Sequence, residues 1–114
     1  MGYDISYHNE NGDQFPADKY KDASTYVSLG ERTTEMGVTF NYSKVYRRFN
    51  FHITDLHGLY GKDVMWQLNR IVKALGTERS EDPWEATDGN AGFALSVLLE
   101  WTKDHPEGFF SVVN

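Results

Sequence analysis

One segment constrains the fold of this chain more than any other, because residues 63–76 carry apolar side chains at the spacing of an α-helix with a single buried face. The apolar positions are Val64, Leu68, Ile71, Val72 and Leu75. Asp63 stands where an N-cap is expected, and Gly76 follows the last apolar position, where helices commonly end in a left-handed residue. The sequence therefore predicts a helix over 63–75 that packs on a second layer.

Two further segments have helical spacing. The first is short, with apolar residues at Tyr42, Val45, Tyr46 and Phe49 and with Asn41 or Ser43 as the expected N-cap. The second runs from about Asn90 to Asp104 and has Ala91, Ala94, Leu95, Leu98 and Leu99 on one face. Pro106 ends it, because the residue before a proline disfavours the helical conformation. We therefore expect about three helices.

Alternating apolar and polar residues predict strands at 3–7, 26–29 and 36–42, and 108–113 is a candidate for a last strand. Asn11-Gly12 is typical of a tight turn, and a polar loop is expected over about 9–24, which contains Pro16. The fold class that follows is α+β. We expect a small antiparallel sheet, built mostly from N-terminal strands, packed against the helices in a single domain over 1–114.

Composition narrows the class of protein. The absence of cysteine excludes a disulfide scaffold, thiolate catalysis, iron–sulfur clusters and zinc fingers. The net charge of −6 disfavours binding to nucleic acid or to an anionic membrane. The longest uncharged apolar run, Ala91–Leu99, is far too short to cross a bilayer, and Met1–Glu10 lacks the features of a signal peptide. We expect a cytoplasmic protein.

A resemblance is carried by the segment Trp84–Gly92, which reads W-E-A-T-D-G-N-A-G and leads into the last helix. With Tyr60–Lys62 and Thr39–Ser43, it resembles a group of small phage-encoded proteins that share a W-E-x-T-x-G-N-A segment before an amphipathic helix. The resemblance covers roughly 38–110, and residues 1–37 match nothing in that group. It implies a phage origin and expression inside an infected bacterial cell, where small accessory proteins often counteract host defence.

The start of the last helix is a candidate anion site. Free backbone N–H groups and the helix dipole favour a phosphate or carboxylate there, and small side chains allow it to come close. The residues concerned are Thr87, Gly89, Asn90 and Gly92. The alternative is structural: Asp88 or Asn90 caps the helix, while Gly92 allows close packing against the sheet.

The concentrated positive charge in this acidic chain is a basic triad formed by Lys44, Arg47 and Arg48. At helical spacing the three side chains lie together, away from the apolar face, and arginine offers two parallel donors to a phosphate or carboxylate. They could therefore hold a phosphorylated ligand or an acidic partner. Alternatively, they form a solvated face that pairs with the acidic segment 78–88.

The three tryptophans have different expected roles. Trp101 flanks the apolar stripe of its helix and is expected in the core. Trp66 falls off the stripe of its helix and is expected to point outward and to anchor an interface, with a second copy of the chain as one candidate partner. Trp84 either stacks on a base or partner, or covers the core. The acidic residues around it, Glu81, Asp82 and Glu85 with Glu78 and Asp88, are expected to meet a basic partner surface.

A histidine cluster, H-x-x-D-x-H at His52–His57, contains residue types that ligate metals, and His8 or His105 could complete the set. However, the spacing fits neither a helical pair nor one strand face, so His52 is expected to pack beside Phe49 and Phe51 instead. No metal and no other cofactor is expected. No nucleophile motif is present either, so the sequence gives no support for catalysis.

Three functions follow as hypotheses. The first is a non-enzymatic protein that binds and inhibits a host bacterial protein, using its acidic surface and outward aromatic residues. The second is a protein that sequesters a small phosphorylated nucleotide signal. The third, and the least favoured, is a small metal-dependent hydrolase built on the histidine cluster.

Overall fold

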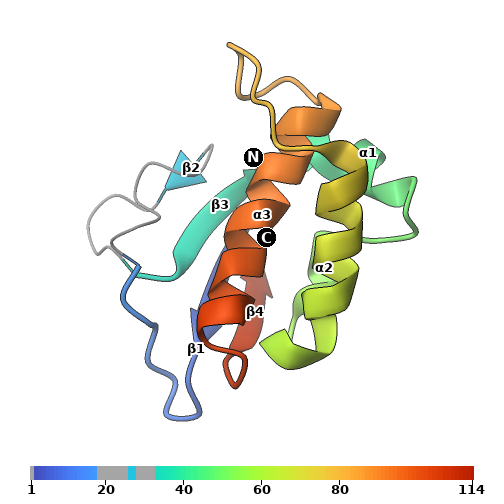
Figure 1. Ribbon diagram of the computed structural model, residues 1–114. Helices are drawn as coiled ribbons and strands as arrows, with labels where there is room; N and C mark the ends of the chain where they lie inside the picture. The colour runs from blue at the N-terminus through green and yellow to red at the C-terminus, as the bar shows by residue number, and fades with distance from the viewer. Residues whose placement is uncertain (1, 18–25, 28–32) are drawn as a thin grey trace.

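The computed structural model describes residues 2–17, 26–27 and 33–114 of the chain. These residues form one antiparallel sheet with the strand order β2-β3-β1-β4. The strands are β1 (Gly2–His8), β2 (Tyr26–Val27), β3 (Glu35–Thr39) and β4 (Phe109–Val113). Because β1 pairs with both β3 and β4, the first and last strands lie side by side (Figure 1). The predicted sheet, mostly N-terminal, is confirmed.

The strands bury one face, as their alternating sequence predicts. Ile5 and Tyr7 of β1 are fully buried, and so is Phe110 of β4, which pairs with Tyr7. On the opposite face Asp4 is exposed and Ser6 is half-buried. Successive side chains of a strand point to opposite faces, so this register places every large apolar residue of β1 against the helices.

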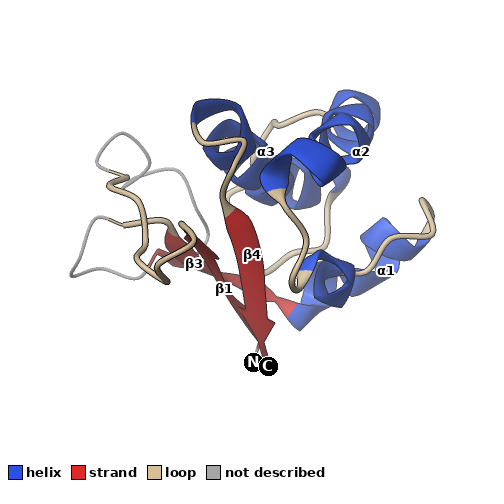
Figure 2. Ribbon diagram, turned by 90° about the horizontal axis from the view of Figure 1, so that it is seen from below, coloured by secondary structure: helices blue, strands red, loops and turns tan. Residues whose placement is uncertain are grey.

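Two long helices cover that buried face, α2 (Gly61–Leu75) and α3 (Asp88–Asp104), while α1 (Ser43–Arg47) lies beside them (Figure 2). The chain runs in opposite directions along α2 and α3 (Figure 1). The predicted stripes meet in one core with the sheet, which includes Val64, Leu68, Ile71 and Leu75 of α2 and Ala91, Ala94, Leu95, Leu98 and Leu99 of α3. The α+β class is therefore confirmed.

The third predicted strand is shorter than expected, because the chain leaves the sheet after Thr39. Residues Phe40–Tyr42 form a 3-10 helix, capped by Thr39, whose hydroxyl accepts a hydrogen bond from the Asn41 N–H at 3.2 Å. The expected caps of α1 are also wrong, since Tyr42 precedes this helix without a side-chain cap and Ser43 is its first residue. α1 ends at Arg47, so Phe49 lies beyond it.

The ends of the long helices were predicted in part. Gly76 follows α2 with φ 77° and donates its N–H to Val72, as expected. Asp63, by contrast, lies in the first turn of α2 and not at its N-cap, which is Tyr60. Thr87 caps α3 through its hydroxyl, in place of the expected Asp88 or Asn90.

The expected polar loop is only partly within the described residues. The turn at 9–13 is confirmed, with Gly12 at φ 85° and the Asn9 N–H bonded to the Asp13 carbonyl at 2.8 Å. Pro16 bridges to Thr33. Residues 18–24 of the loop, and 28–29 of the second predicted strand, lie outside the described part. Among the described helices, none has the length and apolar character needed to span a membrane.

Candidate functional site

The acidic loop, residues 78–87, is held in one conformation by a buried side chain of α3. Asn90 is 2% exposed, and its amide oxygen accepts a hydrogen bond from the Ser80 N–H at 2.9 Å. Its amide nitrogen donates to the Ser80 hydroxyl and to the carbonyls of Asp82 and Glu85, at 2.9 to 3.1 Å. A buried amide with this many partners fixes both the loop and its own orientation. Asn90 therefore holds the acidic loop to the start of α3.

The acidic loop is also fastened to the segment that precedes α1. The Asn41 side chain donates to the Trp84 carbonyl at 2.9 Å, and the Tyr42 hydroxyl donates to the Pro83 carbonyl. Trp84 in turn donates its N–H to the Asp82 carboxylate at 3.0 Å. The acidic loop is thus bonded to a segment that lies about forty residues earlier in the chain.

Arg48 is held apart from the other two residues of the expected basic triad, because it binds Asp88, the first residue of α3, directly after the acidic loop. Two guanidinium nitrogens of Arg48 donate to the two carboxylate oxygens of Asp88, at 2.7 and 3.2 Å. This bidentate contact lowers the pKa of Asp88 and raises the pKa of Arg48, each first through the hydrogen bonds. Both side chains are about half exposed, so the pair contributes little to stability. For Arg48, pairing with the acidic segment is confirmed.

The other two cations of the triad line an open groove. Lys44 and Arg47 lie along it, and Trp84 and Ala86 of the acidic loop lie there as well. The groove measures about 370 Å³, and its remaining lining residues are Phe40, Asn41 and Ser43. Within the described part of the chain, neither Lys44 nor Arg47 forms an ion pair, and no carboxylate lines the groove. Three of the predicted ligand residues, Lys44, Arg47 and Trp84, are therefore brought together.

The remaining predicted anion residues lie elsewhere, at the start of α3. Thr87 and Gly89 line a second open hollow of about 520 Å³, together with Asp88, Glu78 and Arg79. Gly89 packs on the Glu78 backbone so closely that an added Cβ would lie 1.8 Å from its carbonyl oxygen. The two carboxylates and this close packing oppose an anion at the helix start.

Gly92 does allow close packing, but its neighbour differs from the expected one. A Cβ at Gly92 would lie 1.9 Å from the Gly76 carbonyl oxygen and 2.9 Å from the Leu75 side chain. The close contact is therefore with the end of α2 and not with the sheet.

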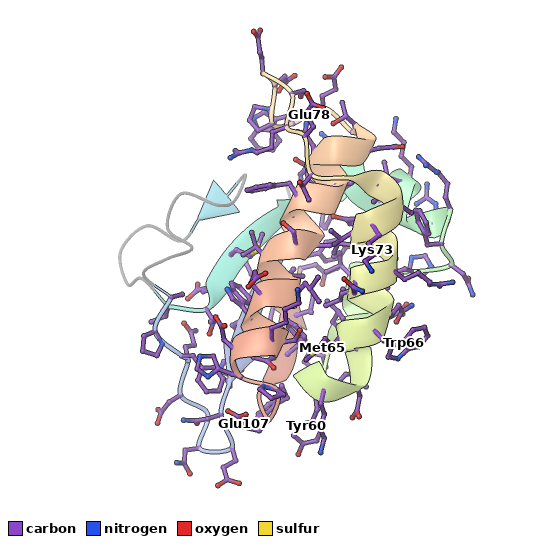
Figure 3. All side chains as sticks on the ribbon, viewed as in Figure 1. Tyr60, Met65, Trp66, Lys73, Glu78 and Glu107 are labelled. Atoms are coloured by element: carbon purple, nitrogen blue, oxygen red, sulfur yellow. The ribbon has the colours of Figure 1, made fainter. Side chains whose placement is uncertain are left out.

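The acidic residues of the loop are exposed to solvent. Glu81, Asp82 and Glu85 are exposed, as is Glu78, which projects from the loop above α3 (Figure 3). Trp84 sits among them with 46% of its surface exposed. The loop thus presents an exposed aromatic side chain and four exposed carboxylates.

The other two tryptophans lie where the sequence places them. Trp101 is 1% exposed and belongs to the core. Trp66 is 65% exposed and projects away from α2 (Figure 3), with the Arg70 guanidinium 5.9 Å from its ring. Tyr60, half exposed, lies at the start of the same helix.

The residues of the histidine cluster have separate structural contacts. The Asp55 carboxylate accepts the His52 N–H at 3.0 Å, and the His57 ring accepts the Val112 N–H at 3.0 Å. His52 is exposed, and its packing beside Phe49 and Phe51 stays a prediction. In the described part of the chain, no group of three or more His, Asp or Glu side chains is close enough to hold a metal ion.

Asn41 and Tyr42 are the residues of this site whose role the sequence did not reveal. Asn41 was expected only as a helix cap and Tyr42 only as a core residue, yet both bind the loop at 83–84. Their partners are backbone carbonyls far along the chain, and such contacts leave no pattern in the sequence. No protein-family model, no curated protein and no solved structure matches this chain.

Proposed function

We propose that this protein is a non-enzymatic binding protein that acts in the cytoplasm of a phage-infected bacterial cell. It binds a basic surface of a host protein through the acidic loop and Trp84, and inhibits that protein by covering the surface. The phage setting rests on the sequence resemblance alone. The observation that carries the binding role is the fastening of the acidic loop by buried Asn90.

A fixed loop favours binding because fewer conformations are lost when the complex forms. The loop at 78–87 contains no helix or strand, yet Asn90, Asn41 and Tyr42 all bind it. Core packing alone does not need an exposed acidic loop to be held in this way. A prearranged contact surface is one use for such a loop.

The chemistry of the loop selects the partner. The four exposed carboxylates of the loop that carries Trp84 match a surface rich in lysine and arginine and speed the encounter with it. Tryptophan, the residue type of Trp84, is among those that most often contribute a large share of the binding energy of an interface when the pocket around them excludes water. The partner we propose is therefore a host protein with a basic site around an apolar depression.

The test is affinity capture of bacterial host proteins by the full chain, quantified by mass spectrometry. Glu81→Gln with Glu85→Gln removes two loop charges, and Trp84→Ala removes the aromatic contact. The matched control is Glu10→Gln with Asp13→Asn, which removes two charges from the distant turn at 9–13.

One host protein is expected to be retained by the wild type and by the control variant. Trp84→Ala should weaken its binding by roughly thirtyfold, since truncating a central interface aromatic costs about 2 kcal/mol. The double glutamate variant should slow association and reduce its salt dependence. Adding the protein in equal amounts should then inhibit the partner. A partner list that is the same for all four proteins would contradict the proposal.

Sequestration of a phosphorylated nucleotide is supported by the groove at Lys44 and Arg47. A metal-dependent hydrolase has no support from the histidine cluster, because His52 and His57 are not brought together with Asp55 in a ligand set among the described residues.

A further inference from the structure

We infer that the groove beside α1 binds a mononucleotide, with its phosphate on Lys44 and Arg47 and its base against Trp84. This inference goes beyond the proposed contact with a host protein, because it assigns a small ligand to a groove whose two cations, Lys44 and Arg47, lie outside the acidic loop. The lining residues of the groove are all neutral or basic, and no carboxylate is among them.

The charge in the groove is unusual for this molecule. The chain has a net charge of −6, yet two exposed cations line one hollow and, in the described part of the chain, neither meets an acidic side chain. Arg48, their neighbour in sequence, is paired with Asp88. Among the described residues, one cation with a carboxylate partner and two without one therefore lie within about one helical turn. Cations next to each other repel, and a bound anion would relieve that repulsion.

The number of cations limits the charge of the ligand. A phosphate monoester carries about −1.5 to −2 at neutral pH, which two cations balance. A triphosphate would leave excess negative charge beside a protein that is already acidic. Arg47 can give two parallel hydrogen bonds to one phosphate, and Lys44 adds a point charge.

The shape and the aromatic wall favour a base over a bare anion. The volume of about 370 Å³ is at the lower end of the range for small-molecule sites, which suits one nucleotide. Trp84 is 46% exposed, and hydrogen bonds to Asn41 and Asp82 fix its backbone beside the groove. Bases of any sequence stack on such aromatic surfaces.

The lining residues include no carboxylate, imidazole or thiol, the groups that most often act as a general base or a nucleophile. Capture without turnover is the expected outcome, and it would make the protein a sponge for a phosphorylated nucleotide signal.

The experiment is calorimetric titration of the full chain with adenosine 5′-monophosphate, guanosine 5′-monophosphate, adenosine and inorganic phosphate, at low salt. Both nucleotides should bind more tightly than adenosine or phosphate alone. Arg47→Ala should weaken nucleotide and phosphate binding at least tenfold and leave adenosine binding unchanged. The nucleotide affinity of Arg47→Lys should lie between those of the wild type and Arg47→Ala, because lysine keeps the charge and loses the two parallel donors.

The matched control is Arg70→Ala, which removes an exposed arginine from α2, outside the groove. An equal loss in Arg70→Ala and Arg47→Ala would overturn the inference, because it would show a response to net charge only. Phosphate binding as tight as nucleotide binding would overturn it too, and so would the absence of nucleotide binding at millimolar concentration.

The two proposals fail separately. Arg47→Ala leaves the acidic loop intact and should not affect the capture of a host protein. Failure of nucleotide binding would therefore leave the protein-binding proposal standing, and loss of the host partner in the glutamate variants would say nothing about the groove.

Discussion

Asn90 determines whether the acidic loop has one conformation or many. Its amide meets Ser80, Asp82 and Glu85 in a place that water does not reach. Truncation to alanine would leave the Ser80 N–H without its acceptor, which costs about 1–3 kcal/mol. The carbonyls of Asp82 and Glu85 would keep the N–H groups of Glu85 and Thr87 as partners. The loop backbone would then have to move toward solvent to regain hydrogen bonds.

We predict that Asn90→Ala lowers the melting temperature by roughly 5–10 °C, given that 1 kcal/mol corresponds to about 4–8 °C in a domain somewhat smaller than this one. Hydrogen exchange should speed up selectively over 78–87. Asn69→Ala is the matched control, since Asn69 is half-buried on α2 and its side chain has no hydrogen bond in the described structure. A melting temperature that changes equally little in both variants would show that Asn90 does not hold the loop.

At the same scale, residue identities predicted some contacts and missed others. Glycine at 92 and 76 was predictable, because a close approach and a left-handed turn each favour glycine. The pairing of Arg48 with Asp88 was only one of the alternatives, since sequence spacing does not show which charge a flexible arginine will meet.

Among the secondary-structure elements, α2 was predicted most fully, because its apolar stripe is long and leaves one face that must be buried. The end of β3 was not predicted. Met36 and Val38 alternate as a strand does, but the bonds of Asn41 and Tyr42 to the loop at 83–84 turn the chain away after Thr39. Tertiary hydrogen bonds decided that boundary, and alternation alone could not locate it.

The exposed side of α2 carries a prediction of its own. Trp66 is 65% exposed, and the half-exposed Tyr60 lies at the start of the same helix. A tryptophan in this position is typical of an interface anchor, and a second copy of the chain is one candidate partner.

We predict that the wild type exceeds its monomer mass of 13.1 kDa at about 100 μM, and that Trp66→Ala returns it to the monomer without a large change in melting temperature. Light scattering after size-exclusion chromatography gives the mass directly. Lys103→Ala, an exposed change on α3, serves as the control. A wild type that is already monomeric at this concentration would exclude Trp66 as a self-association contact.

For the molecule as a whole, the candidate groove could be predicted only in pieces. Lys44 and Arg47 were expected to bind a ligand, and so was Trp84, but about forty residues separate them. Their meeting depends on the packing of α3 between the two segments and on the fastening of the acidic loop. Such a constellation is a property of the tertiary structure, and one sequence does not display it.

Two buried tyrosines make the stability of the whole fold sensitive to alkaline pH. Burial raises the pKa of Tyr46 well above its usual value of 10, and burial with the nearby Glu107 carboxylate does the same for Tyr7. The native state therefore holds these protons more tightly than the unfolded chain. The stabilisation is complete below pH 10 and is lost as the pH rises above 10, where only the unfolded chain ionises.

We predict that the melting temperature falls steeply above pH 10 and that tyrosinate absorbance at these two positions appears together with unfolding. Tyr46→Phe should be less stable at pH 7, because it loses the hydrogen bond to the Ala91 carbonyl. Its melting temperature should nevertheless fall less steeply above pH 10 than that of the wild type. Tyr60→Phe, at a half-exposed position, is the matched control and should keep the wild-type slope. Equal slopes in the wild type and Tyr46→Phe would mean that Tyr46 does not cause the alkaline loss.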